Sequence, residues 1–164
     1  MKKKIILGID PGYGRTGYGV IDAQGQKLTC LDYGVIETSA REKFKDRLNH
    51  LHQDLKKIIK KYNPEIVAIE DLFFFKNAKT AMKVGQARGV IILTAVQAKK
   101  EVVEFTPLQV KQAIAGYGRA EKAQMQKMVK VLLGLKELPK PDDAADALAI
   151  AICAASTLRL REFV

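Results

Sequence analysis

Short apolar runs rich in β-branched residues alternate along the chain with longer stretches of helical periodicity. The runs have the length of buried strands, and they predict strands at residues 4–10, 16–23, 27–38, 65–70 and 102–105. Short turns join the first three, which are therefore predicted to form an antiparallel meander. The fourth run is almost continuously apolar, as expected of a parallel strand that is reached through a helical crossover.

Five other stretches have the properties of helices. Residues 48–62 place leucine and isoleucine on one side and lysine on the other, and Asn63-Pro64 ends this helix. The other helices are predicted at residues 76–98, after Thr106-Pro107, at 121–134 and at 142–156. The order βββαβαβααα predicts one α/β domain over residues 1–164, built on a five-stranded mixed sheet flanked by helices.

Acidic residues occupy positions in this pattern where apolar residues are expected. Asp10 and Glu70 end the first and fourth strands, and Asp143 and Asp146 open the apolar last helix. Carboxylates are rarely buried unless they are paired or bind metal, because desolvating a lone charge costs several kcal/mol. Asp143 and Asp146 are three residues apart, so they lie on one face of a helix. A helix cap would explain Asp142 or Asp143, and a solvated strand end would explain Asp10 or Glu70 singly, but neither explains Asp146 among its alanines.

The rest of the chain is basic. It has 28 Lys and Arg against 18 Asp and Glu, a formal net charge of +10. This excess favours nucleic acid or another anionic surface as the partner. A group of acids in a basic protein therefore suggests divalent cations held against a polyanion.

Several features indicate a cytoplasmic protein without a membrane segment. The first apolar run is too short for a signal peptide, and charged residues interrupt the helix at 76–98, which excludes a bilayer span. Cys30 and Cys153 have neither CxxC nor Cys/His spacing. They are interpreted as reduced core thiols and not as a disulfide or a zinc site.

The glycine-rich segment Gly12–Gly17 matches GxGxxG, the motif of dinucleotide-binding folds. That motif requires a helix after its last glycine, whereas here a strand follows, so we reject a dinucleotide site. We expect these glycines to bend the backbone away from Asp10 and leave its carboxylate open to a substrate. A strand ending in Asp, followed by a glycine turn and a hairpin, is typical of the ribonuclease H-like fold and of actin- and sugar-kinase-type ATPases. The ATPases need two such domains, so 164 residues favour a nuclease.

Six groups of residues, in order along essentially the whole chain, form a recognisable set. They are Gly8–Gly12 with Thr16–Val20, Ala68–Glu70 with Phe73 and Asn77, Gly85–Val90, Gln109–Gln112, Ala120–Lys122, and Asp143–Ala149. This set closely resembles the RuvC family of Holliday-junction resolvases. The resemblance implies a bacterial, cytosolic, homodimeric endonuclease of the ribonuclease H-like fold. It further implies action on four-way junction DNA together with the branch-migration motor of recombination and repair.

The resemblance implies that Asp10, Glu70, Asp143 and Asp146 are the catalytic carboxylates. Some members of the family carry His where this chain has Asp143. Phosphodiester hydrolysis needs an activated water and a stabilised leaving oxygen, which two Mg²⁺ ions roughly 3.5–4 Å apart can supply. Four carboxylates without His or Cys suit Mg²⁺ better than zinc, with Mn²⁺ as a possible substitute. Asp10, at the end of a central strand, is the expected bridging ligand.

DNA contacts are expected around these acids. Three consecutive phenylalanines, 73–75, cannot all face a core, and the resemblance selects Phe73, with Phe74 second, to stack on an unpaired base. Such a contact is worth ~1–3 kcal/mol. Lys111 and Lys122 match basic positions near the family's active site and are assigned to phosphate neutralisation, although a lysine on a basic helix is solvated by default. The residues expected along the flanking DNA backbones are Lys76, Lys79, Arg119, Lys127 and Lys130.

Two alternatives remain from sequence. One is a different ribonuclease H-like nuclease, acting on RNA–DNA hybrid or in strand transfer. The other is a non-catalytic junction-binding module. The intact acidic quartet argues against the second, since such acids repel DNA unless metal offsets their charge.

Overall fold

The computed structural model describes the backbone of residues 3–71 and 78–162, and the side chains of that part through residue 158. Its elements follow the predicted order: β1 (Lys4–Asp10), β2 (Arg15–Gln24), β3 (Lys27–Glu37), α1 (Phe44–Tyr62), β4 (Ile66–Glu70), α2 (Ala78–Gln97), β5 (Glu101–Phe105), α3 (Pro107–Ala115), α4 (Lys122–Leu132) and α5 (Asp142–Glu162). The predicted α/β architecture is confirmed.

The five strands form one mixed sheet in the order β3-β2-β1-β4-β5. β1, β2 and β3 pair antiparallel, which confirms the predicted meander. β4 joins β1 in parallel and β5 joins β4 in parallel, each after a helical crossover. β1 and β4 are therefore central neighbours that run in the same direction and end at the same edge of the sheet.

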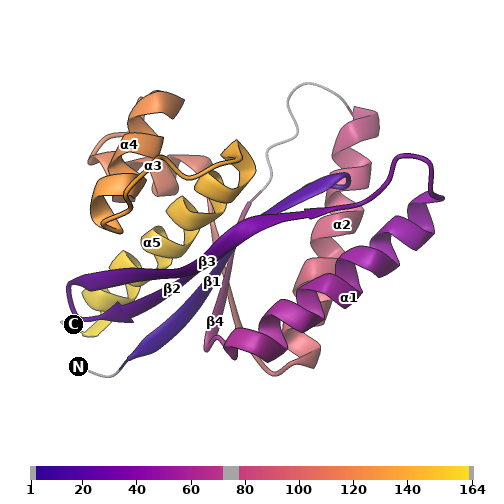
Figure 1. Ribbon diagram of the computed structural model, residues 1–164, viewed down its shortest axis with the longest axis horizontal. Coiled ribbons are helices and arrows are strands. Elements are labelled where there is room, and N and C mark those ends of the chain that lie inside the picture. Colours follow the sequence, from indigo (N-terminus) through magenta and orange to yellow (C-terminus); the bar gives the residue numbers. More distant parts are fainter. Residues whose placement is uncertain (1–2, 72–77, 163–164) are drawn as a thin grey trace.

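Helices cover both faces of the sheet (Figure 1). α1 and α2 lie on one face, where they bury one set of alternating strand residues that includes Leu7, Ile9 and Val67. α5 lies on the opposite face, and α3 and α4 pack against α5, burying a second cluster that includes Ile6 and Ala68. Successive strand side chains point to opposite faces, so continuously apolar strands supply both cores.

Two helices extend well beyond their predicted ends. α1 begins at Phe44, before the first predicted leucine, Leu48. α5 continues to Glu162, past its predicted end near residue 156, because no glycine or proline interrupts that stretch. α3 begins as expected at Thr106-Pro107, with a capping box in which Thr106 and Gln109 satisfy each other's backbone amides.

α5 packs unusually close to the sheet because glycines line the strands beneath it. A Cβ on Gly8 would lie 2.1 Å from the carbonyl oxygen of Ala147, and one on Gly17 would lie 1.9 Å from that of Asp143. Gly19, which pairs with Gly8 across the strands, meets the side chain of Leu148 in the same way. Gly17, which the sequence indicated only as part of the turn after Asp10, thus also makes room for the start of α5.

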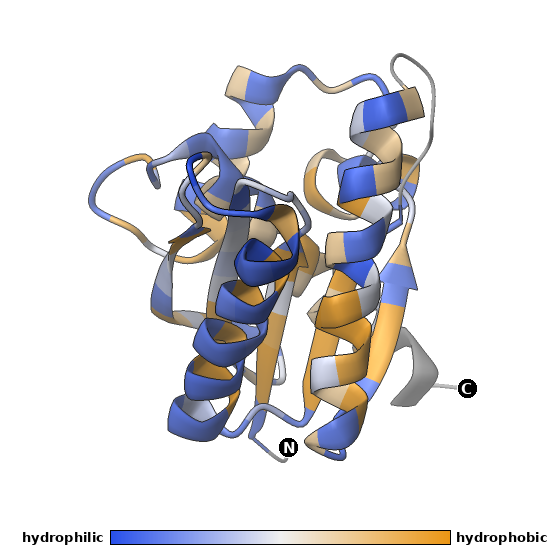
Figure 2. Ribbon diagram, turned by 90° about the vertical axis from the view of Figure 1, so that its right-hand side faces the viewer, coloured by the Kyte–Doolittle hydropathy of each residue, from blue (hydrophilic) through white to orange (hydrophobic). Residues whose placement is uncertain are grey.

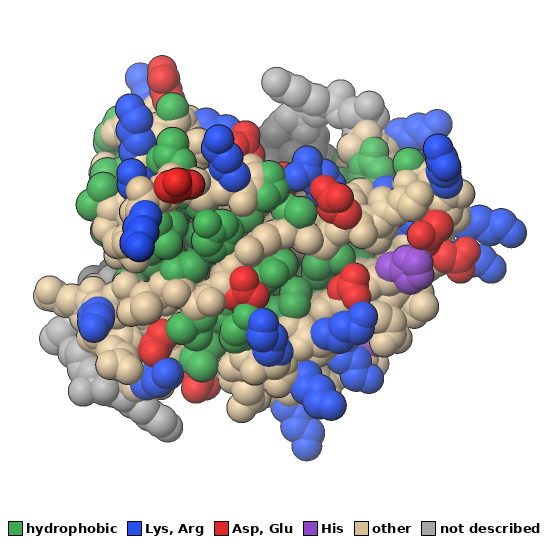
Figure 3. Space-filling model, viewed as in Figure 1, with side chains coloured by type: hydrophobic (Ala, Val, Ile, Leu, Met, Phe, Trp, Pro, Cys, Tyr) green, Lys and Arg blue, Asp and Glu red, His purple; other side chains and the backbone are tan. Residues whose placement is uncertain are grey.

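Positive side chains are spread over the outer surface. Figure 3 shows Lys and Arg side chains over α4 at the upper left and over α1 at the lower right. Within the part of the chain that the structure describes, no helix is both long and apolar enough to cross a membrane.

Candidate active site

Asp10 and Glu70 end neighbouring parallel strands and point to the same face of the sheet. Residues two or four apart on a strand point to the same face. Asp10 lies four residues after Ile6, and Glu70 lies two residues after Ala68. Ile6 and Ala68 belong to the core beneath α5. Both carboxylates therefore project toward α5 at the carboxyl edge of the sheet, where α/β proteins commonly bind their ligands.

The first turns of α5 bring the other two acids to this edge. Gly17 pairs with Asp10 across β1 and β2, and the backbone of Asp143 lies directly over Gly17. Asp146 follows one helical turn later on the same face. The helix amino terminus favours negative charge, which partly offsets the cost of placing two more carboxylates beside Asp10 and Glu70.

The acids repel one another in the absence of a cation. Burial, followed by the charges of Glu70, Asp146 and Asp143, raises the pKa of Asp10 from 3.8 to about 8. Burial and the charge of Asp146 raise the pKa of Glu70 to about 7. Burial also raises the pKa of Asp146, although Lys122 opposes that shift. Asp10 therefore lies within electrostatic reach of the other three carboxylates that the sequence predicts.

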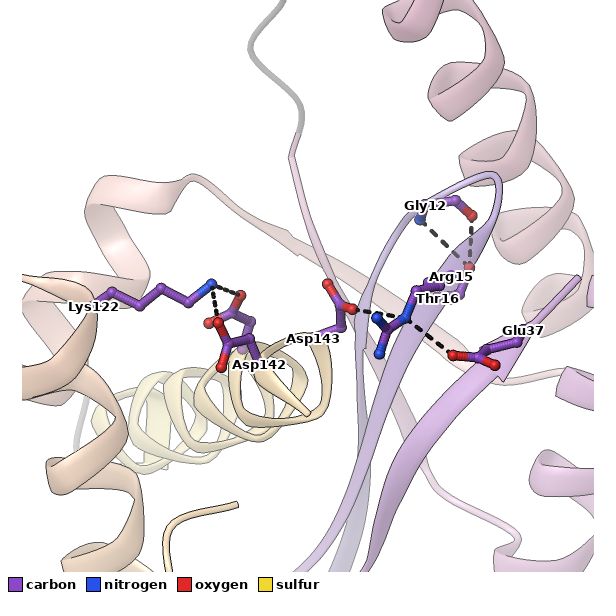
Figure 4. A network of polar contacts seen from close by, with 8 residues as sticks. Gly12, Arg15, Thr16, Glu37, Lys122, Asp142 and Asp143 are labelled. Carbon is purple, nitrogen blue, oxygen red and sulfur yellow. Dashed lines mark hydrogen bonds and ion pairs between the residues drawn. The ribbon is translucent and has the colours of Figure 1, made fainter. Parts of the chain in front are cut away.

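Two cations flank the acids (Figure 4). On one side, Lys122 Nζ lies 3.1 Å from Asp142 Oδ2 and 3.7 Å from Asp146 Oδ2. Partial burial lowers the pKa of Lys122, but the hydrogen bond to Asp142 and the nearby acids outweigh it, so the net shift is upward. On the other side, Arg15 Nε lies 3.4 Å from Asp143 Oδ2 and 3.2 Å from Glu37 Oε1.

A hollow of about 280 Å³ opens beside Glu70 and Asp146. Lys111 of α3 and Lys122 of α4 line it, together with apolar residues that include Pro107 and Met125. The charge of Lys111 acts to lower the pKa of Glu70, so this lysine is close to the acids as expected. Arg119 is exposed between α3 and α4 and is not among the residues that line this hollow.

The carboxylate oxygens are suitable ligands for a divalent metal ion, but their side chains are not close enough together to surround one. Among the described residues, no three His, Cys, Asp or Glu side chains are close enough to hold one ion. Asp143 faces Arg15 and Asp146 faces Lys122, which keeps these two acids apart. The donors are all oxygens, the set that Mg²⁺ prefers, and the raised pKa values of Asp10 and Glu70 show a site whose charge a cation would relieve.

Arg88 of α2 anchors the end of β4 next to Glu70. Its Nη2 lies 2.7 Å from Glu104 Oε1 and 3.5 Å from Asp71 Oδ1. The amide of Asp71 also donates to the carbonyl oxygen of Phe105. Asp71, the residue directly after β4, thus joins β4 to α2 and β5.

Sequence reasoning missed Arg15, the partner of Asp143, and Thr16. Thr16 is 1% exposed, and its hydroxyl donates to the carbonyl oxygen of Gly12 at 2.7 Å, which closes the turn after Asp10 (Figure 4). Their position directly after the glycine turn was the available signal. Phe73, Phe74 and Lys76 lie outside the described residues.

Carboxylates at the carboxyl ends of β1 and β4, completed by the amino terminus of α5 on a β3-β2-β1-β4-β5 sheet, define a ribonuclease H-like protein. The family model described as crossover junction endodeoxyribonuclease RuvC matches residues 6–154. The chain therefore belongs to the RuvC family.

Relatives and solved structures agree with this assignment. The chain is 57% identical over 156 residues to crossover junction endodeoxyribonuclease RuvC of Halothermothrix orenii, covering 95% of this chain and 94% of that protein. It is 60% identical over 149 residues to the Caldicellulosiruptor saccharolyticus protein of the same name, covering 90% of each. The structure of Thermus thermophilus RuvC in complex with Holliday junction substrate superimposes with a TM-score of 0.92 at 39% identity, over 96% of each chain.

Proposed function

We propose that this protein is an endonuclease that resolves four-way (Holliday) DNA junctions by metal-dependent hydrolysis of phosphodiester bonds during recombination and repair. The observation that carries the proposal is the meeting of Asp10, Glu70 and Asp146 at one edge of the sheet, beside Lys111 and Lys122. Family membership supports it, as does the Thermus thermophilus relative solved with its junction substrate. We also propose that residues 1–164 form a single nuclease domain.

The catalytic and metal-binding residues in this proposal are Asp10, Glu70, Asp143 and Asp146, with two Mg²⁺ ions per site and Mn²⁺ as a substitute. Bound divalent ions supply an activated water and stabilise the leaving oxygen. Asp10 and Glu70 are fixed by two central strands, so they define the position of the site. Asp143 and Asp146 lie at one helix end, where they pair with Arg15 and Lys122, and they would complete the ligand set for the ions.

Lys111 and Lys122 are proposed to hold the scissile phosphate. If Asp146 held a metal ion, the Lys122 ammonium, now 3.7 Å from Asp146 Oδ2, would be free to pair with a phosphate oxygen. Arg119, which is exposed nearby, and Lys76 are proposed to follow the flanking backbone.

Comparing three substrates tests the proposed function. With Mg²⁺ present, the protein is incubated with a mobile four-way junction, a linear duplex and an RNA–DNA hybrid. We expect paired cuts in the junction and little cutting of the other two. Preferential cutting of the hybrid would instead support the alternative ribonuclease H-like activity, and junction binding without any cutting would support a non-catalytic module.

The protein is further proposed to act as a homodimer through α2. Met82, Leu93 and Val96 are 70%, 56% and 56% exposed, and Gly85 and Gly89 lie between them on the same helical face. Figure 2 shows this helix with apolar residues outward, whereas α1 beside it presents a hydrophilic face. Small residues on such a stripe permit close approach of a second copy, and a two-fold dimer would present two sites to a symmetric junction.

Leu93→Glu is expected to convert the dimer to a monomer. Placing a charge at the centre of an apolar interface should weaken association by about 30-fold or more, the size of a typical hot-spot loss. Sedimentation at micromolar concentration measures the effect, with Lys60→Glu on the exposed side of α1 as the control. A wild-type protein that sediments as a monomer both with and without junction DNA would remove the dimer from the proposal.

Phe73→Ala is expected to lower junction cleavage more than junction binding. The proposed stacking on an unpaired base positions the scissile phosphate, while lysines supply most of the affinity. Cleavage rate and dissociation constant are measured on the same junction, with Phe74→Ala as the comparison. Equal losses in both quantities, or no loss in either, would show that the ring has no stacking role.

We also propose that the enzyme works in the cytoplasm with the branch-migration motor of recombination. The support for this partner is family membership alone. Co-purification of the two in the presence and absence of a junction tests it.

A further inference from the structure

A second hollow lies on the other side of the carboxylates from Lys111 and Lys122. It has a volume of about 630 Å³ and lies between the turn after β1, the end of β3 and the first turns of α1. The lining residues used below are Tyr13, Arg15, Thr38, Ala40, Arg47 and Asp143. We call it the Arg47 hollow. Asp143 lines this hollow and Asp146 lines the first one, so the start of α5 lies between the two hollows.

Arg47 is a nearly buried cation without an acidic partner. It is 9% exposed, and none of the described residues places a carboxylate within ion-pair distance of its guanidinium. The two carboxylates at this hollow, Glu37 and Asp143, are both paired with Arg15. An arginine stays protonated in proteins, and a buried charge without an anion is costly. The hollow is therefore built around a positive charge that lacks its counter-ion.

The Arg47 side chain is held in one orientation by its surroundings. Its Nε donates to Thr38 Oγ1 at 3.0 Å, and the Thr38 hydroxyl donates to the carbonyl oxygen of Tyr13 at 3.1 Å. The guanidinium carbon lies 5.3 Å from the centre of the Tyr13 ring. Nη2 lies so close to Gly14 that a Cβ there would be 3.0 Å from it. Only Nε is used by Thr38, so the terminal amino groups of the fork remain for a ligand.

A second cation adds to the positive field. Lys83 Nζ lies 5.4 Å from the centre of the Tyr13 ring and 5.8 Å from that of Phe44. Again, no carboxylate in the described parts of the chain forms an ion pair with it. Arg47 and Lys83 therefore both lie near the Tyr13 ring. A planar arginine fork with an adjacent lysine recognises the oxygens of a phosphate group.

We propose that the Arg47 hollow binds a backbone phosphate of the junction strand, on the opposite side of the scissile phosphate from Lys111 and Lys122. This inference rests on the proposed function. A strand whose scissile phosphate lies at the carboxylates meets Lys111 and Lys122 in one direction. In the other direction it meets Arg15 and then Arg47, because Asp143 and Arg15 connect the carboxylates to the hollow. The site therefore contacts the strand on both sides of the bond to be cut.

A matched pair of variants at Ala40 tests the proposal without disturbing a buried residue. Ala40 is exposed and lines the hollow, and Ala40→Glu differs from Ala40→Gln only in charge. Junction binding is measured by anisotropy over a range of salt concentrations without divalent metal. We expect Ala40→Glu to bind about 5–10-fold more weakly than Ala40→Gln at 0.1 M salt, because a charge pair near a protein surface interacts by about 1 kcal/mol or more.

Arg47→Gln and Arg47→Lys form a second pair. Losing one phosphate contact reduces the slope of log affinity against log salt by about 0.9 per hollow, so we expect a shallower slope in Arg47→Gln and a nearly unchanged one in Arg47→Lys. Lys57→Gln, on the exposed side of α1 and paired with Asp54, is the control and should behave as the wild type. If Arg47→Gln does not fold, as judged by its thermal midpoint, the Ala40 pair decides the result.

Three outcomes would overturn the proposal. Equal affinity in Ala40→Glu and Ala40→Gln would show that no phosphate approaches the hollow. Weaker binding by Arg47→Gln with an unchanged salt slope would assign Arg47 a structural role. In a third outcome, inorganic phosphate alone stabilises the wild type but not Arg47→Gln, and the two Ala40 variants bind the junction equally well. That result would assign the hollow to a free anion. Failure of the proposed function is distinct, because the wild type would then show no preference for a junction over linear duplex.

Discussion

Asp10→Asn, Glu70→Gln, Asp143→Asn and Asp146→Asn are each expected to lose junction cleavage by roughly 10³-fold or more, as on loss of other essential catalytic groups. Each substitution keeps the shape of the side chain and removes one anionic oxygen ligand for metal. Junction binding should persist, since lysines and arginines hold the DNA, and should tighten without Mg²⁺ because a negative charge near phosphate is gone. Gel-shift and cleavage assays on the same preparation measure both effects.

Lys57→Gln is the control for these four variants and should cut at the wild-type rate, because Lys57 is exposed on α1 and pairs with Asp54, not with the four acids. Full activity in Asp146→Asn would contradict the assignment of Asp146 as a metal ligand. Loss of junction binding in any of the four would show that the acids act through the fold and not through metal.

The same substitution at Asp10 is expected to stabilise the metal-free protein. The pKa of Asp10 is about 8 in the folded chain, against an ordinary value of 3.8, so ionised Asp10 favours unfolding. This cost is absent below about pH 4, grows as the pH rises, and is complete above pH 8. Asp10→Asn should therefore increase the free energy of unfolding by roughly 1–3 kcal/mol at pH 8.5 and much less at pH 5.

Thermal or denaturant unfolding at the two pH values measures this effect. Adding Mg²⁺ should stabilise the wild type, because ligands that bind only the folded state raise its stability, and should stabilise Asp10→Asn less. An equal effect of Asp10→Asn at pH 5 and pH 8.5 would contradict the proposed crowding of acids.

Gly8→Ala is expected to destabilise the fold by about 3 kcal/mol or more, at the upper end of overpacking costs. The new methyl would lie 2.1 Å from the carbonyl oxygen of Ala147 and 2.7 Å from the amide nitrogen of Ala151. These are backbone atoms of α5, so relief requires the whole helix to move. That movement would also carry Asp143 and Asp146 away from Asp10, so cleavage should fall even at temperatures where the variant remains folded.

Gly85→Ala is the matched control. Apart from the backbone of α2 itself, no atom of the described residues lies within 4 Å of its added methyl, and alanine favours a helix over glycine by up to about 1 kcal/mol. Both changes are measured in the Leu93→Glu background, so that contacts between protomers do not contribute. A loss at Gly8 no larger than that at Gly85 would show that close packing of α5 is not required.

The sequence alone determined the element order, the mixed sheet and the four acids. The apolar runs ending in Asp10 and Glu70 could be recognised because period and length distinguish buried strands from amphipathic helices. Asp143 and Asp146 stood out because their neighbours are almost all apolar. Each of these signals is local, since it depends only on residues adjacent in the chain.

Only the tertiary structure decided how these elements meet. The role of Gly17 beneath Asp143 depends on a helix more than a hundred residues later in the chain, so no local pattern could reveal it. The pairing of Arg15 with Asp143 and the position of Arg47 without an acidic partner likewise depend on which strand end faces which helix. Sequence shows which charges are present, whereas their burial and distances, which set the energies, arise only when the chain folds.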